Sequence, residues 1–110
     1  MIKGHRIETF EEIPTFLDRL SSFSENTIEC TEHTLFRLSE KQRKVFTCDE
    51  LKQLLLHETP LKIGVQVNGN YAVYYKHKEK LKIVKVIIGL KPTIISIVTF
   101  YILHMDQLPR

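Results

Sequence analysis

Residues 61–103 decide the fold, and they read LKIGVQVNGNYAVYYKHKEKLKIVKVIIGLKPTIISIVTFYIL. The stretch is rich in β-branched and aromatic residues, which favour strands. The pair Asn68-Gly69 lies between two apolar runs and predicts a hairpin turn. Further turns are predicted at Lys78-Glu79 and at residues 89–92. We therefore predict strands over residues 61–67, 71–77, 80–88 and 93–103. The short connections predict an antiparallel meander.

Three helices are predicted before these strands. Residues 10–23 carry apolar side chains at spacings of three and four, and Pro14 suits the first turn of a helix. A second helix is expected over residues 32–41. Thr47 and Glu50 form a capping box that starts the third helix, which ends before Pro60.

The fold class expected from these elements is α+β, with N-terminal helices packed on a four-stranded antiparallel β-meander. A chain of 110 residues fits one domain, residues 1–110. Residues 1–30 read as an N-terminal extension with one helix. Residues 31–104 read as a core of two helices and four strands.

Composition limits the compartment and the partners that we expect. The most apolar stretch, residues 94–103, is about half of the roughly 20 residues that a membrane-spanning helix needs. The N-terminal residues do not combine a basic start with an apolar run, so the sequence predicts no signal peptide. We therefore expect a cytoplasmic protein without a membrane partner. Two cysteines, Cys30 and Cys48, are too few for a disulfide framework, so reduced thiols are expected.

The candidate chemistry begins in residues 32–51, EHTLFRLSEKQRKVFTCDEL. His33 and Arg37 are four positions apart, so a helix would place them on one face, about 6 Å apart at Cβ. An imidazole can move the proton of a ribose 2′-hydroxyl, and a guanidinium can hold phosphate oxygens. Arg43 follows at the predicted helix end. The alternative interpretation is a solvated polar helix face.

Two further groups lie on the predicted strands. Alternation places Thr99 and Tyr101 on one face, where Tyr101 would donate to phosphate or stack on a base; otherwise it is a core tyrosine with its hydroxyl at the rim. A basic run would either follow a nucleic-acid backbone or protect an edge strand from aggregation. It comprises Lys76, His77, Lys78, Lys80, Lys82 and Lys85.

Other classes of site have weaker support. Cys48 would lie in the first turn of a helix, which lowers a thiol pKa, but no base is assigned to it. The five histidines show no metal-binding spacing, and the chain has no glycine-rich phosphate loop. We expect no metal and no cofactor. The net charge of +3 permits a nucleic-acid partner without requiring one.

The order His33, Arg37, Arg43, Val45, Thr47 and Asp49-Glu50 resembles the opening of a family of small proteins grouped with the RelE and BrnT toxins, within the barnase–EndoU–colicin–RelE class of ribonucleases. Residues 98–101, VTFY, resemble the final core strand of that family. The resemblance covers residues 31–101, and its motif is loose.

The resemblance implies metal-independent RNA cleavage by attack of the 2′-hydroxyl on the adjacent phosphate. It implies that His33, Arg37 and Tyr101 are catalytic and that Arg43 binds phosphate. From the basic run, Lys76 and Lys82 are the candidate phosphate-binding residues. A toxin of this kind would have RNA as its substrate and a cognate antitoxin protein as its partner. The alternative function is a non-catalytic α+β module that binds a protein or forms a homodimer through an apolar part of the sheet.

Overall fold

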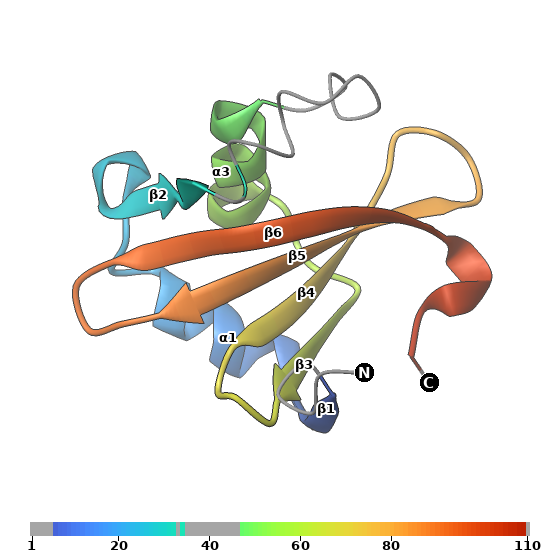
Figure 1. The fold of residues 1–110 in the computed structure, drawn as a ribbon, viewed down its shortest axis with the longest axis horizontal. Helices are drawn as coiled ribbons and strands as arrows, with labels where there is room; N and C mark the ends of the chain where they lie inside the picture. Colours follow the sequence, from blue (N-terminus) through green and yellow to red (C-terminus); the bar gives the residue numbers. More distant parts are fainter. Residues whose placement is uncertain (1–5, 33, 35–46, 110) are drawn as a thin grey trace.

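The computed structural model describes residues 6–32, 34 and 47–109, and its fold is α+β (Figure 1). Among these residues the α-helices with complete bounds are α1 (Ile13–Leu20) and α3 (Cys48–His57), and the 3₁₀ turns are η2 (Glu25–Thr27) and η4 (Met105–Gln107). The strands are β1 (Ile7–Glu11), β2 (Ile28–Cys30), β3 (Lys62–Gln66), β4 (Tyr71–Lys76), β5 (Lys82–Leu90) and β6 (Ile95–His104).

All six strands form one mixed sheet, in the order β1-β3-β4-β5-β6-β2. Neighbouring strands are antiparallel except β2, which runs parallel to β6. The prediction of a four-stranded antiparallel meander under several N-terminal helices is therefore wrong. Strands from the first thirty residues add to both edges of the sheet, and among the described residues only α1 is an N-terminal α-helix.

Local sequence signals explain where several elements begin and end. Pro14 lies in the first turn of α1, as predicted. The Thr47 capping box is also confirmed. The backbone N–H of Glu50 donates to the Thr47 hydroxyl, and the N–H of Thr47 donates to the Glu50 carboxylate, both at 3.1 Å. Gly69 has a φ of 90° in the turn between β3 and β4, where glycine avoids the penalty of a side chain.

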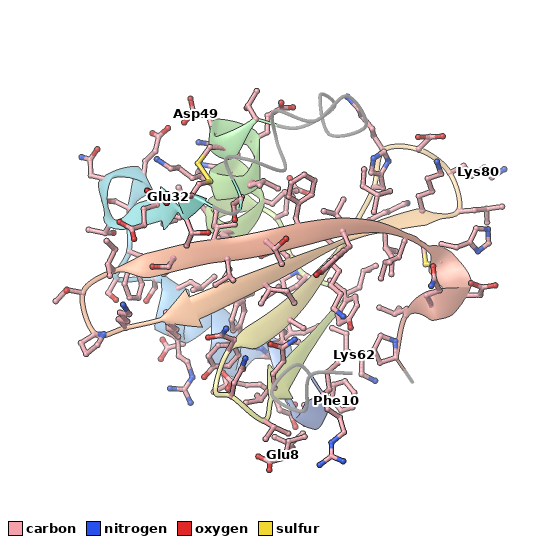
Figure 2. The ribbon with its side chains drawn as sticks, viewed as in Figure 1. Glu8, Phe10, Glu32, Asp49, Lys62 and Lys80 are labelled. Atoms are coloured by element: carbon pink, nitrogen blue, oxygen red, sulfur yellow. A yellow bond between two sulfur atoms is a disulfide. The ribbon has the colours of Figure 1, made fainter. Side chains whose placement is uncertain are left out.

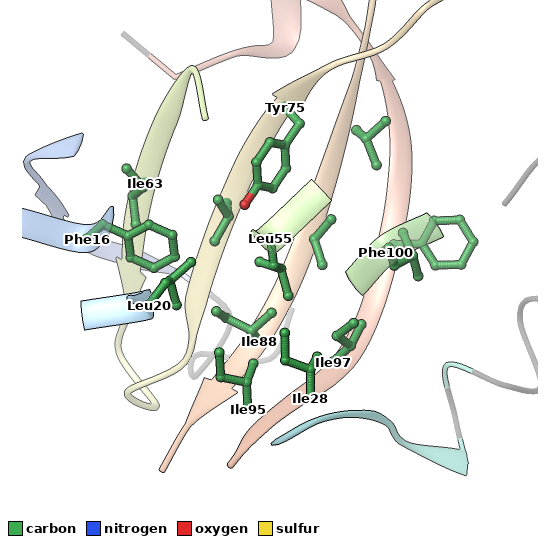
Figure 3. Packing of buried hydrophobic residues seen from close by; sticks show 14 residues of the cluster. Phe16, Leu20, Ile28, Leu55, Ile63, Tyr75, Ile88, Ile95, Ile97 and Phe100 are labelled. Atoms are coloured by element: carbon green, nitrogen blue, oxygen red, sulfur yellow. The ribbon is translucent and has the colours of Figure 1, made fainter. Parts of the chain in front are cut away.

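One face of the sheet packs against both α-helices, and it holds the larger core (Figure 3). Phe16 of α1 and Leu51 of α3 are fully buried there, against Val73 and Val86 of the sheet. The opposite side of the sheet, which we call the far face, has its own smaller cluster. Its buried members are Ala72, Tyr74, Ile83 and Ile87, with Ile7, Met105 and Leu108 packed at its borders.

The segment that precedes α3 is fastened to the sheet at both of its ends. The hydroxyl of Thr31 donates to the backbone carbonyl of Val98 in β6 at 3.1 Å. Cys30 and Cys48 form a disulfide with their Cα atoms 6.2 Å apart, seen in Figure 2 between the labelled Glu32 and Asp49. The expectation of two reduced thiols is wrong, because the parallel pairing of β2 brings Cys30 beside the start of α3.

The predicted helix over residues 32–41 falls largely outside the described residues, which omit 33 and 35–46. Within the part of the chain that the structure describes, no helix is both long enough and apolar enough to cross a membrane.

Candidate functional site

A row of alternating lysine and tyrosine side chains crosses the far face. The strand register pairs Lys62 with Tyr74, Tyr74 with Lys85, and Lys85 with Tyr101. The Nζ of Lys85 lies 5.7 Å from the ring centroid of Tyr74 and 5.8 Å from that of Tyr101. At the outer end of the row, the Nζ of Lys62 lies 4.6 Å from the ring centroid of Phe10 (Figure 2). Each lysine is therefore within cation–π range of an aromatic ring.

Lys85 is the central cation of this row. Burial lowers the pKa of Lys85, because a half-buried ammonium loses part of its hydration. No carboxylate among the described residues forms an ion pair with Lys85. Within this part of the chain the ammonium lies near the faces of two tyrosine rings, so its charge can attract an anionic or carbonyl-bearing ligand.

A hollow of about 130 Å³ lies beside Lys85 on the far face. Its floor is formed by the buried residues Gln66, Ile87 and Thr99. Its half-buried rim is formed by Asn70, Lys85, Val98 and Tyr101. The lining therefore combines two apolar side chains with amide, hydroxyl and ammonium groups, and contains no acidic residue.

A bulge in β6 shapes one wall of the hollow. The β5–β6 register passes from Ile87 opposite Thr99 to Ile88 opposite Ile97, so Val98 is the extra residue. A bulge of this kind redirects neighbouring side chains, and bulges are common beside functional sites. Here it brings both Val98 and Thr99 to the lining of the same hollow.

Two polar atoms of the floor have no hydrogen-bond partner among the described residues. They are Oε1 of Gln66, a residue that is 3% exposed, and Oγ1 of Thr99, which is 7% exposed. Leaving a buried polar group unpaired costs about 1–3 kcal/mol. Such groups in a native protein call for a specific explanation, and a bound water or ligand in the hollow would supply one.

A second polar hollow, of about 470 Å³, lies between α3 and the end of β4. Its lining includes Glu50, Glu58, Lys76 and the buried His77. The Nδ1 of His77 accepts a 2.8 Å hydrogen bond from the backbone N–H of Glu79, so a neutral ring would keep its proton on Nε2. The bond that fixes this tautomer lies within the β4–β5 turn.

The structure places only some of the residues predicted from the sequence. His33, Arg37 and Arg43 lie outside the described residues. Tyr101 lines the hollow on the far face. Strand alternation puts the exposed Lys76 on the same face, since Lys76 pairs with Ile83 of the far-face cluster.

The second candidate phosphate-binding lysine, Lys82, does not share that face. It precedes Ile83 in β5, so alternation turns it to the side of Val84, which belongs to the larger core. Its Nζ forms a 3.3 Å ion pair with Glu79. The structure therefore brings Lys76 and Tyr101 to one face and separates Lys82 from them.

Sequence reasoning missed the residues that form most of the hollow. From the sequence, Lys85 is predicted only as one member of a basic run, and neither Gln66 nor Asn70 is predicted as a site residue. One signal could have indicated Lys85 as a site residue: it is the single charged residue in the apolar run IVKVII, residues 83–88. A lysine in such a strand must lie on a sheet face among apolar neighbours, where charged residues are rare. Gln66 carried no comparable signal.

The molecule is thus a mixed-sheet α+β protein with a polar hollow on the sheet face away from α1 and α3. The family model described as the MJ0788 family matches residues 14–87, which is most of the chain. The chain belongs to the MJ0788 family. No curated protein and no solved structure matches it. Nothing in these comparisons links it to the RelE or BrnT toxins, so that resemblance remains a prediction.

Proposed function

We propose that this protein binds single-stranded RNA on the far face and cleaves it without a metal ion. The observation that carries the binding part is the position of Lys85 between the rings of Tyr74 and Tyr101. Sheet faces that present cations and aromatic rings suit single-stranded RNA, because the cations attract phosphates and the rings stack with bases.

The roles within the row differ with exposure. Tyr74 is 2% exposed, so it supports Lys85 from below and has no free face for a base. Tyr101 is half-buried at the rim, and its ring is the candidate stacking surface. Lys85 and Lys76 would attract the phosphates that follow a bound nucleotide.

The cleavage part of the proposal rests on the sequence. His33 would transfer the proton of the 2′-hydroxyl, and Arg37 and Arg43 would hold the phosphate under attack. Tyr101 would support the same site, and Lys82 would bind a more distant phosphate. A ribonuclease of the toxin type would also need a protein antitoxin and would act in the cytoplasm.

The Cys30–Cys48 disulfide is unusual for most cytoplasmic proteins, although intracellular proteins of hyperthermophiles do contain disulfides.

Binding is tested by fluorescence anisotropy with a labelled 12-nucleotide RNA of mixed sequence. Tyr101→Leu removes the stacking surface and is expected to weaken binding by roughly tenfold. Tyr101→Phe keeps the ring and should bind nearly as well. Lys85→Gln should reduce the slope of log K against log salt by about 0.7, as expected for one lost phosphate contact. The matched control is Lys91→Gln, which removes an exposed charge from the turn after β5. No binding at low salt would refute the proposal.

Cleavage is tested separately, by incubating the RNA with the protein in a chelator and analysing the products. Attack by the 2′-hydroxyl breaks the bond from phosphorus to the 5′-oxygen of the next nucleotide, so the products end in a 2′,3′-cyclic phosphate and a protonated 5′-hydroxyl, which mass spectrometry detects. His33→Ala and Arg37→Ala are expected to abolish the product while binding persists. Intact RNA at high protein concentration would refute cleavage and leave the binding proposal standing.

A second candidate function is a non-catalytic module for protein contact or homodimerisation. It is favoured by two exposed apolar side chains, Phe10 at 43% and Leu61 at 38%, which line one hollow of about 400 Å³ next to edge strand β1. It predicts a concentration-dependent dimer in analytical ultracentrifugation that Phe10→Ser weakens. A monomer at all concentrations would argue against homodimerisation.

A further inference from the structure

The hollow on the far face is the size of one small ring. Its volume of about 130 Å³ is close to that of an engineered cavity, about 150 Å³, that accommodates benzene. A single six-membered ring fits this space, and the fused rings of a purine need more room. Ile87 and Val98 supply apolar contacts for the faces of such a ring.

The polar lining calls for a ring with hydrogen-bonding groups on its edge. Oε1 of Gln66 is an acceptor without a donor in the described part of the chain, and Oγ1 of Thr99 can donate or accept. The Asn70 side chain adds an amide at the rim. A ligand that pairs both atoms therefore presents a donor to Gln66 and a second polar group to Thr99, and a ring with an N–H donor and a carbonyl acceptor on its edge does so. Both uracil and cytosine meet this requirement.

We infer that the hollow beside Lys85 is a binding pocket for a single pyrimidine base of the RNA. This inference rests on the proposed function. Gln66 accepts a hydrogen bond from the base, Thr99 bonds to a second position on its edge, and Lys85 at the rim meets the phosphate of the same nucleotide. The far face therefore selects RNA sequence as well as strandedness, with a purine excluded by size.

The geometry also separates base selection from general affinity. Thr99 and Gln66 lie on the floor, where only a group that enters the hollow reaches them. Lys85 and Tyr101 lie at the rim, where any RNA strand reaches them. Variants of Gln66, Thr99 and Asn70 should change the ratio of affinities between sequences, and variants of Lys85 and Tyr101 should weaken all sequences alike.

The test measures the binding of four labelled 12-nucleotide homopolymers, U, C, A and G, at one salt concentration. The wild-type protein is expected to bind the U or C oligomer at least about tenfold more tightly than the A and G oligomers. Thr99→Val, which replaces the hydroxyl by a methyl group of similar size, should reduce that ratio five- to tenfold. Gln66→Met should have a similar effect. Thr93→Val is the matched control, because Thr93 is exposed in the β5–β6 turn.

Each outcome of the binding test either supports or overturns the pyrimidine pocket. Equal affinity for all four oligomers, or a ratio that Thr99→Val and Gln66→Met leave unchanged, overturns the pyrimidine pocket while RNA binding stands. If no oligomer binds, the proposed function fails, and titration of ¹⁵N-labelled protein with free uridine and cytidine then decides on the pocket alone. Shifts of the Gln66 and Asn70 side-chain amides at millimolar nucleoside would support it. The absence of such shifts would overturn it.

If a floor variant fails to fold, Asn70→Ser at the rim takes its place. This variant must reduce the ratio of pyrimidine to purine affinity for the inference to hold.

Discussion

The hydroxyl of Thr34 donates a 2.7 Å hydrogen bond to the backbone carbonyl oxygen of Ile97, within the bulged region of β6. The backbone N–H of Thr31 donates to the same carbonyl at 3.0 Å. Thr34 is fully buried, so this bond is protected from water. The chain that leads away from β2 is therefore held against the strand that forms the wall of the far-face hollow.

Thr34→Val tests this contact. The variant keeps the shape of the side chain and removes its donor, but the Ile97 carbonyl still accepts from Thr31. We therefore expect a loss of about 1 kcal/mol in the free energy of unfolding, near the net value of one hydrogen bond. Urea denaturation measures it. Thr93→Val, at an exposed position, should change stability by less than about 0.5 kcal/mol. Equal stability of the two variants would contradict this account.

The disulfide should contribute more than any single hydrogen bond. Cys30 and Cys48 are 18 positions apart, and closing a loop of this length stabilises a folded chain by roughly 3 kcal/mol. Urea denaturation with and without a thiol reductant should show this difference. Mass spectrometry after thiol alkylation verifies the redox state of both samples. Equal midpoints for oxidised and fully reduced protein would show that the cross-link does not stabilise the fold.

Gly64 allows Ile7 of β1 to lie directly on the far face. A Cβ at position 64 would approach Cδ1 of Ile7 to 2.9 Å and both of its Cγ atoms to 3.1 Å. Gly64→Ala should therefore destabilise the protein by about 1–3 kcal/mol, as overpacking does. Ile7→Ala in the same chain removes the clash. The double variant should be more stable than the sum of the two single effects predicts, measured as a double-mutant cycle. Simple additivity would rule out this contact.

Lys85 should make stability depend on pH in the alkaline range. Burial lowers its pKa in the folded protein, while the unfolded chain keeps the ordinary value of 10.5. Between these two values the unfolded state binds more protons, so the free energy of unfolding rises with pH. Lys85→Gln should lose this rise. Tyr74, whose pKa is raised by burial, is present in both proteins and cancels in the comparison.

The comparison is made by urea denaturation of wild type and Lys85→Gln at several pH values between neutrality and 10.5. The direct check is a ¹³Cε titration of the lysines, in which the pKa of Lys85 should lie below the ordinary lysine value of 10.5. Identical pH dependence of the two proteins would contradict the burial of the Lys85 ammonium.

Elements set by neighbouring residues could be predicted from the sequence, and those set by distant residues could not. The Asn68-Gly69 turn and the Thr47 cap depend on residues within a few positions, and both are confirmed. β2 has only three residues and no periodicity, because its pairing with β6 defines it. The disulfide was missed for the same reason, since the spacing of two cysteines does not show that a parallel strand brings them together.

The candidate site was predictable to a smaller degree. Alternation correctly suggested that Thr99 and Tyr101 share a face, because that rule holds along a single strand. The neighbours of Tyr101 in the site come from other strands. The register between β5 and β6 depends on the Val98 bulge, which no local sequence pattern predicts. Gln66 and Lys85 join the site only once four strands are in register.

The parallel pairing of β2 has a consequence for how the protein is made. Glu29 pairs with Ser96, 67 positions later, and β1 pairs with β3. A ribosome therefore releases both edge strands long before the strand that receives β2 exists. Contacts between such distant residues slow folding. During synthesis β2 must therefore wait without its partner, and the sheet closes only after residues 95–104 have been translated.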